Sequence, residues 1–198
     1  MASKDRILRL KDETKMSILE AAYKIVKEEG WQALSMRKIA DEIEYTAPII
    51  YEYFANKEAI LAEFNKRGYL YLASELETAR DKHEHPADQL EAMWMAYWAF
   101  AFRKKELYQL MFGVSMNCCA GQKSAEAAVP EKLITDVIRK LMAGKDLPEN
   151  EVCRRYYTFW SVVHGLISIN LVNQGRSDEI NKQVLKDAIG GIIRAIER

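Results

Sequence analysis

Histidine and cysteine are scarce in this 198-residue chain, and their spacing does not fit a catalytic or metal site. His83 and His85 flank Glu84 in a polar connector, where solvated surface is the simplest interpretation. Cys118 and Cys119 are adjacent and would form a strained redox pair, and the third cysteine stands alone. No further ligand follows at metal spacing, and no phosphate loop or nucleophile triad is recognisable. We therefore expect no catalytic residue, no metal and no cofactor, so an enzyme is the weaker reading of this chain.

Aromatic and methionine side chains are concentrated in two stretches, residues 92–116 and 149–174. Aromatic residues at helical spacing are more often core than ligand pocket. This many of them, with adaptable methionines beside them, can also line an apolar cavity that has a few polar groups. His164 can donate to a ligand in such a cavity, or it can be a satisfied core histidine.

Two short helices joined by a tight turn are predicted from Ser35 to Tyr53. Ser35 and Thr46 are N-cap candidates, and Pro48 lies in a first turn, where its missing N–H costs little. The turn falls at Glu44-Tyr45. This is a helix-turn-helix pattern, and its second helix can lie in the major groove of DNA.

Other helices are predicted from the periodicity of apolar residues and from the positions of glycine and proline. Only four prolines and nine glycines interrupt the chain, and no useful strand pattern is present. The sequence predicts an all-α protein of about nine helices: a three-helix DNA-binding domain over residues 1–56, and a helical bundle for ligand binding and dimerisation over 57–198. The expected helices span about 12–29, a short stretch after Ser35, 47–53, a long stretch that begins at residue 57, and then about 86–103, 105–113, 129–144, 149–174 and 178–197, with a polar segment over 75–88.

Residues 18–64 resemble the DNA-binding half of the tetracycline-repressor (TetR) family. The specific part is the run 35–57, with Ile39-Ala40 in its first short helix and Tyr51, Phe54 and Lys57 at family spacing. A looser resemblance, at 101–113 and 159–171, is to a TetR subgroup marked by a Trp–His–Gly element, here Trp160, His164 and Gly165. The chain departs from the family at Glu44, where glycine is usual.

The resemblance implies a repressor that binds operator DNA and is released by a small, largely apolar effector. Ser35 and the helix N-terminus after it can take a phosphate, and Lys57 resembles the family's phosphate-binding lysine. Ala47 and Pro48 offer only apolar contact to base edges. The expected DNA contacts are Ser35, Met36, Arg37, Thr46, Ala47, Pro48, Tyr51, Tyr53 and Lys57. For Met36, packing on the helix surface is the alternative, whereas Tyr51 is expected both to contact DNA and to pack its ring against the first helix.

The family also implies a palindromic double-stranded operator and a homodimer, since one such unit makes too few contacts for a specific site. An apolar seam near the C-terminus is the expected dimer interface, with packing inside its own subunit as the alternative; it consists of Leu185, Ile189, Ile192 and Ile196. The expected ligand pocket consists of Trp94, Tyr97, Trp98, Tyr108, Phe112, Met116, Tyr157, Trp160 and His164.

Global charge is balanced, with 29 basic and 29 acidic residues, so any DNA contact must rest on a local patch. The first fifteen residues lean basic, and a solvated, disordered tail is the alternative interpretation. No stretch reaches the roughly 18–20 apolar residues of a membrane span, and the start is too charged for a signal peptide. We expect a cytoplasmic protein with no membrane partner. The remaining rival is a DNA-binding factor of the same fold that has no effector.

Overall fold

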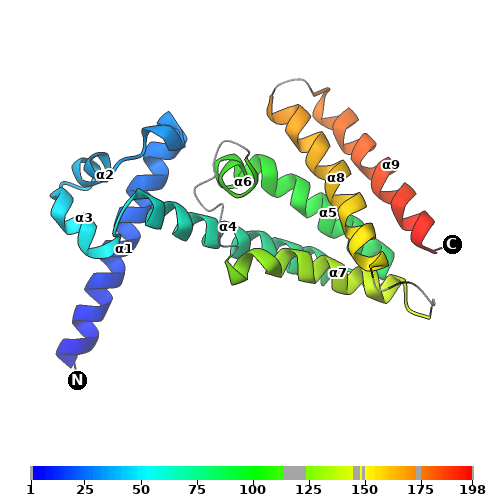
Figure 1. The fold of residues 1–198 in the computed structure, drawn as a ribbon, viewed down its shortest axis with the longest axis horizontal. Coiled ribbons are helices and arrows are strands. Elements are labelled where there is room, and N and C mark those ends of the chain that lie inside the picture. The colour runs from blue at the N-terminus through cyan, green and yellow to red at the C-terminus, as the bar shows by residue number, and fades with distance from the viewer. Residues whose placement is uncertain (1, 114–123, 145–147, 149, 173–174, 198) are drawn as a thin grey trace. The chain divides into compact units, whose positions relative to one another are not determined.

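The computed structural model describes residues 2–113, 124–144, 148, 150–172 and 175–197, and all regular structure within these ranges is helical (Figure 1). This confirms the all-α prediction. The helices are α1 (Ala2–Glu29), α2 (Met36–Glu42), α3 (Ala47–Tyr53), α4 (Lys57–Arg80), α5 (Pro86–Arg103), α6 (Lys105–Phe112), α7 (Val129–Leu141), α8 (Glu151–Leu171) and α9 (Asp178–Glu197), with short 3-10 turns at η1 (Trp31–Ala33) and η3 (Ala125–Ala128).

The chain forms two units, one from the described residues of 1–65 and 109–120 and the other from those of 66–108 and 121–198. Helices α4 and α6 therefore each contribute residues to both units. The sequence-based boundary between residues 56 and 57 stays a prediction, since it was drawn on the end of the helix-turn-helix pattern rather than on contacts.

The core of the first unit is built on the apolar stripe of α1. Buried residues of α2, α3 and the first half of α4 also contribute to it: Ile18, Leu19, Ala22, Ile25 and Val26 from α1, Ile39 and Ala40 from α2, Ile50 from α3, and Ile60, Leu61 and Phe64 from α4. Trp31 of η1 packs edge-on against Phe64, with ring centroids 5.5 Å apart. Burying one edge of each short helix fixes which edge stays in solvent.

Helix α1 begins earlier than its apolar period predicts. Periodicity indicated a start near Asp12, but the helix extends back to Ala2, and residues 5–13 of it are solvent-exposed. The alternative of a disordered tail is wrong for these residues. The whole span from Ala2 to Glu29 lacks glycine and proline, so the helix nucleated over the core can propagate outward on propensity alone.

The expected cap at Ser35 is confirmed by its geometry, and the expected start of a helix at residue 57 is confirmed by a cap at Asn56. The side chain of Ser35 accepts the N–H of Lys38 at 3.2 Å, and that of Asn56 accepts the N–H of Ala59 at 2.9 Å. Thr46 differs from expectation: it has the extended backbone of an N-cap, but its side chain makes no capping hydrogen bond. The hydroxyl of Thr46 is therefore not committed to the helix.

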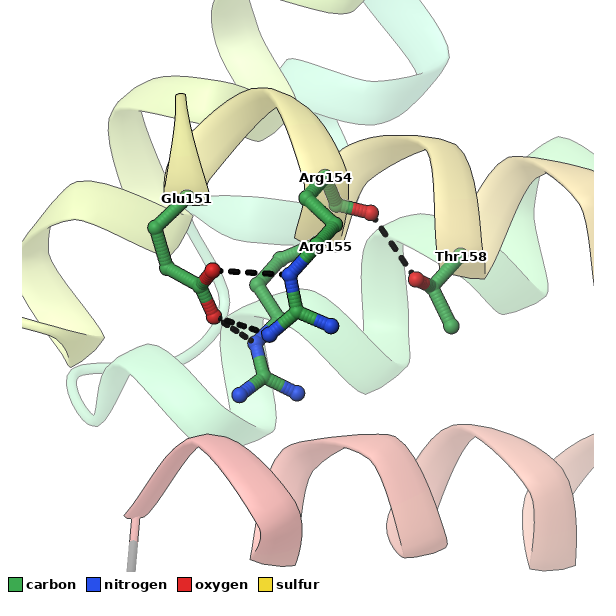
Figure 2. A network of polar contacts seen from close by, with 4 residues as sticks. All are labelled: Glu151, Arg154, Arg155 and Thr158. Carbon is green, nitrogen blue, oxygen red and sulfur yellow. Dashed lines mark hydrogen bonds and ion pairs between the residues drawn. The ribbon is translucent and has the colours of Figure 1, made fainter. Parts of the chain in front are cut away.

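The second unit packs α5 against α7, α8 and α9, and α8 lies beside α9 (Figure 1). Its core is rich in aromatic residues from α5 and aliphatic residues from α9. The first turn of α8 is fastened by Glu151, whose carboxylate accepts hydrogen bonds from Arg154 Nε at 2.7 Å and Arg155 Nε at 2.8 Å (Figure 2). Hydrogen bonding from Arg154 and the charges of both arginines lower the pKa of Glu151. An ionised carboxylate at this position also complements the positive end of the helix dipole.

The turn between α2 and α3 carries a strained residue. Glu44 has φ 57°, which makes it the one described residue other than glycine with a positive φ. The geometry is thus the left-handed one in which the family's usual glycine is unstrained, and the chain adopts it with a side chain that favours other conformations.

Glu44→Gly should raise the free energy of unfolding by up to about 1 kcal/mol, because it relieves this strain. The matched control is Glu52→Gly on the exposed side of α3, where the same substitution should cost about 1 kcal/mol of helix propensity. Denaturant titrations of both variants measure the two signs. Equal losses at the two positions would contradict the assigned strain.

Candidate nucleic-acid interface and aromatic cluster

The helix-turn-helix consists of α2 and α3, which pack on each other, while α2 also packs on α1. Ile39 and Ala40 of α2 and Ile50 of α3 are buried. Because these residues hold the inner edges, the start and outer edge of α3 face solvent. An exposed short helix held at its back is the arrangement that groove binding requires.

The structure leaves most of the expected DNA contacts accessible. Ser35, Arg37, Thr46, Pro48 and Tyr51 are exposed, and Ala47, Tyr53 and Lys57 are partly exposed. Met36 is the exception, because its side chain is only 7% exposed and belongs to the core of the unit. Its alternative reading as a packing residue therefore fits better, and only its backbone N–H remains for a phosphate.

The basic side chains near α2 and α3 divide into paired and unpaired ones. Lys38 forms an ion pair with Glu29, and Lys24 forms one with Glu42, both at 2.6 Å. No described carboxylate pairs with Arg37. Lys57 donates one hydrogen bond from Nζ to the carbonyl of Trp31 at 3.0 Å, which holds the ammonium in place and leaves two N–H donors for a phosphate.

Two further residues extend this surface beyond the sequence-based set. Tyr45, in the turn before α3, is exposed, and its hydroxyl is a possible phosphate donor. Lys15 of α1 has its Nζ 5.5 Å from the ring centroid of Phe54, which ends α3. The sequence did contain a signal for Tyr45 as a DNA contact, namely an aromatic residue inside a tight polar turn. Nothing in the sequence spacing placed Lys15 next to Phe54.

An aromatic cluster occupies the core of the second unit, between α5, α6 and α8. Trp94 of α5 stacks on Phe159 of α8, with centroids 5.5 Å apart and planes at 21°. The ring of Tyr97 lies 5.6 Å from Trp94 and 6.1 Å from Tyr108 of α6. Aromatic pairs in these geometries contribute more than their buried area alone.

Polar atoms inside this cluster are linked from helix to helix. Trp160 Nε1 donates to the hydroxyl of Tyr97 at 3.3 Å, and the hydroxyl of Tyr108 lies 2.5 Å from Nδ1 of His164. The rings of Trp160 and His164 are stacked, 4.8 Å apart and 18° from parallel. One side of the cluster, formed by Trp160 and His164, is partly exposed.

Burial keeps the titratable groups of the cluster uncharged. It raises the pKa of Tyr97, Tyr108 and Tyr156, so their hydroxyls stay protonated. It lowers the pKa of His164 below its ordinary value of 6.5, so the imidazole is neutral near pH 7. A neutral His164 with its proton on Nε2 accepts the hydroxyl of Tyr108.

The expected ligand pocket is thus brought together in part. Trp94, Tyr97, Tyr108, Trp160 and His164 share the cluster, and Tyr157 lies exposed at its rim beside Trp160. Trp98 is buried but packs on Phe102, at 4.7 Å, and lines a separate surface hollow of about 220 Å³. Phe112 is half-buried at the end of α6, in the portion of that helix that belongs to the first unit. Met116 lies outside the described residues. Phe159, buried at the centre of the cluster, was missing from the expected set.

The expected dimer seam lies inside its own subunit. Leu185, Ile189 and Ile196 are buried in the core of the second unit, and Ile192 is half-buried. These side chains have little surface left for a partner, so the alternative reading of the seam fits them better. The outward faces of α8 and α9 carry a different apolar set, namely Tyr157, Val162, Ile169, Val172, Ile180 and Val184. Gly165 and Gly191 lie on the same helices with open space over their Cα atoms.

Among the described residues, no three histidine, cysteine or acidic side chains are grouped so as to hold a metal ion. None of the described helices combines the length and apolarity that crossing a bilayer requires. Of the cysteines, Cys153 is exposed and forms no disulfide with a described residue, and Cys118 and Cys119 lie outside the described residues.

Two family models match the chain. The model of bacterial regulatory proteins of the tetR family matches residues 18–69, and that of the tetracyclin-repressor-like C-terminal domain matches residues 90–188. Together they cover the helix-turn-helix and the helices that form the aromatic cluster.

Two sequence relatives are described as HTH-type transcriptional regulators. An uncharacterized one from Haemophilus influenzae is 34% identical over 83 residues, 42% of this chain and 44% of the relative, so the chain spans less than half of that relative's length. HbdR of Aromatoleum sp. is 26% identical over 167 residues, 79% of this chain and 72% of HbdR.

Among solved structures, Thermus thermophilus FadR aligns with a TM-score of 0.60 and 18% identity over 92% of each chain. That structure is described as a TetR family transcriptional repressor in complex with lauroyl-CoA.

The lowered pKa of His164 predicts a specific pH dependence of stability. Because the folded pKa lies below the unfolded one, the unfolded chain binds the proton more readily. The stabilising effect of a neutral His164 is present above pH about 6.5 and is lost as pH falls through the folded pKa. Denaturant titrations at pH about 7.5 and about 5.5 should show a larger loss for the wild type than for His164→Gln.

His83→Gln is the control for this measurement, because His83 is exposed in a connector. It should follow the wild-type pH dependence. An equal loss for the wild type and His164→Gln would show that this histidine does not carry the effect.

Proposed function

Because these matches show that the chain belongs to the TetR family of bacterial regulatory proteins, we propose that it is a sequence-specific DNA-binding transcriptional regulator. The observation that carries the proposal is the helix-turn-helix: α3 is buried along one edge through Ile50 and is open to solvent at Thr46, Pro48 and Tyr51. Assignment to the Trp–His–Gly subgroup stays a prediction.

In the proposed complex, different residues contact the phosphates and the base edges. Arg37, unpaired among the described residues, and Lys57, held by the carbonyl of Trp31, supply positive charge for phosphates. Thr46 and Pro48 meet base edges, where they offer a hydroxyl and an apolar contact. Since neither is a bidentate reader, part of the sequence preference comes from DNA shape.

The proposed active form is a homodimer that places two copies of α3 on a palindromic operator, about 34–36 Å apart. Support comes from the outward faces of α8 and α9, where Ile169 and Val184 are each 48% exposed. Large apolar side chains exposed on two adjacent helices are stabilised by a partner rather than by water. Two copies of one face make an isologous interface.

We also propose repression that is relieved by a small, largely apolar effector bound in the aromatic cluster. FadR, which has a similar fold, was crystallised in complex with lauroyl-CoA, and this supports a ligand-responsive role for the present protein. Release of DNA requires the effector to bind the two states of the protein with different affinity, with a typical coupling of about 1–3 kcal/mol.

An effector-independent DNA-binding factor of the same fold is the second candidate. Its support is the close packing at the centre of the cluster, where Trp94, Tyr97 and Phe159 are all buried. Under this reading the cluster is core only. A metal-dependent enzyme has no support from the described residues, since no three histidine, cysteine or acidic side chains among them are grouped to hold a metal ion.

Arg37→Ala should weaken operator binding by about tenfold or more and flatten the dependence of affinity on salt, because a phosphate contact or a base contact is lost. The operator is first obtained by selecting bound fragments from the host's DNA. Fluorescence anisotropy over a salt series then measures affinity. Lys38→Ala is the matched control, since the neighbouring lysine is already paired with Glu29. Failure of the wild type to bind any duplex at low salt would refute the DNA-binding function.

Replacing both Ile169 and Val184 with glutamate should convert the dimer to a monomer, because dimerisation would then bury unpaired carboxylates. Both side chains are solvent-exposed in the single chain, so the fold of the subunit should persist. Sedimentation velocity measures the oligomeric state, and circular dichroism checks the helices. Lys186→Glu, on another exposed part of α9, is the control and should remain dimeric. A dimeric double variant would exclude these faces as the interface.

A further inference from the structure

The indole of Trp94 contains the most conspicuous unsatisfied polar atom in the second unit. The residue is 0% exposed, and its Nε1 has no hydrogen-bond partner in the described part of the chain. Leaving a buried donor unpaired costs free energy comparable to a lost hydrogen bond, so such groups are rare in native cores. If this position were only part of the core, an acceptor beside the indole N–H, or phenylalanine in place of tryptophan, would avoid this cost.

Three aromatic rings lie next to Trp94. Phe159 stacks on its ring, Tyr97 lies 5.6 Å from it, and Tyr156 lies 6.1 Å from it. The neighbouring indole, that of Trp160, is satisfied, because it donates to Tyr97. Of these two tryptophans in one cluster, only the deeper one has a free donor.

The cluster also has a side that can open. Trp160 and His164 are stacked on each other at its partly exposed side, with exposed Tyr157 beside Trp160. The bond from Trp160 Nε1 to Tyr97 is 3.3 Å long, beyond the usual range for such bonds. Rotating Trp160 outward therefore breaks one weak hydrogen bond and its ring contacts with Tyr157 and His164, and it opens space next to Tyr97, which itself lies beside Trp94.

The chemistry of this space selects the ligand. The rings of Trp94, Tyr97, Phe159 and Trp160 provide flat apolar walls. The polar groups among them are hydroxyls, indole N–H groups and an imidazole. Burial raises the pKa of the Tyr97 and Tyr108 hydroxyls and lowers the pKa of the His164 ring, so all three groups are neutral. None of these groups compensates the charge of a buried carboxylate or phosphate.

We propose that the N–H of Trp94 is the donor that recognises the effector, and that the effector is an uncharged, largely aromatic molecule with a hydrogen-bond acceptor such as a carbonyl. The acceptor pairs with Trp94 Nε1, while the ring takes the place vacated by Trp160. This inference rests on the proposed effector-responsive function and names the ligand class of that site. A site built around an unpaired donor discriminates strongly against ligands that lack the acceptor.

Three probes that share one ring test the proposal: acetophenone, isopropenylbenzene, in which a methylene replaces the carbonyl oxygen, and benzoate. Binding to the full-length protein is followed in the indole region of a ¹⁵N correlation spectrum, where the peak of Trp94 is the one missing in Trp94→Phe. We expect acetophenone to shift this peak and to bind at least about tenfold more tightly than isopropenylbenzene, a difference of about 1.4 kcal/mol. Benzoate should not bind in the cluster.

Trp94→Phe keeps a ring but removes the N–H. It should abolish the preference for the ketone over the alkene, while both still bind. Trp98→Phe is the matched control: Trp98 lies one turn along α5, is equally buried, and packs on Phe102 outside the cluster. This variant should keep the wild-type preference. Far-ultraviolet circular dichroism of both variants confirms that each is folded.

Several results would overturn the proposal. These are equal binding of the ketone and the alkene to the wild type, a ketone preference that survives in Trp94→Phe, tighter binding of benzoate than of acetophenone, or no binding of any probe up to its solubility limit. Operator affinity is measured in parallel without probes. DNA binding that persists while the probe preference is absent removes only the ligand assignment, whereas absence of DNA binding removes the regulatory function itself.

Discussion

The burial of one edge of α3 is the constraint on which the DNA-binding surface depends. Ile50 and the capping residue Phe54 hold this seven-residue helix against its own unit. A helix so short is unstable in isolation, so its position comes from packing rather than from propensity. The same contacts that stabilise it leave Thr46, Pro48 and Tyr51 in solvent, and the strained turn at Glu44 sets the angle at which α3 leaves α2. Recognition is in this sense a consequence of core packing.

The second unit applies a different constraint, because its core is made largely of amphipathic rings. Each buried phenol or indole needs a partner for its polar atom, and Tyr97 and Tyr108 find theirs on α8. Those bonds tie α5 and α6 to one helix. A ligand that competes for any of these atoms therefore changes how three helices are fastened together. A core of leucine and valine of the same volume would be tighter but could not respond in this way.

Much of this architecture could be predicted from the sequence, and the parts that could not share a physical cause. The starts of α5 and α9 follow from helix-breaking residues: α5 begins at Pro86, and α9 begins at Asp178 after a glycine and polar residues. Ser35 and Asn56 were predictable as caps because capping is local. The start of α1 was not, because its exposed turns have no apolar period to detect. The neighbours of Lys57 and Trp94 were not either, since each depends on residues distant in the chain.

Helix α9 shows this limit most clearly. Its sequence contains two apolar stripes, one through Leu185 and Ile189 and one through Ile180 and Val184. Periodicity alone selects the longer stripe, and the structure places that stripe inside the subunit. A helix that is apolar on two sides has to be covered on both. Within the described residues α5 and α8 cover one side of α9, and the stripe through Ile180 and Val184 is exposed, which is why we propose this stripe for contact with a second subunit.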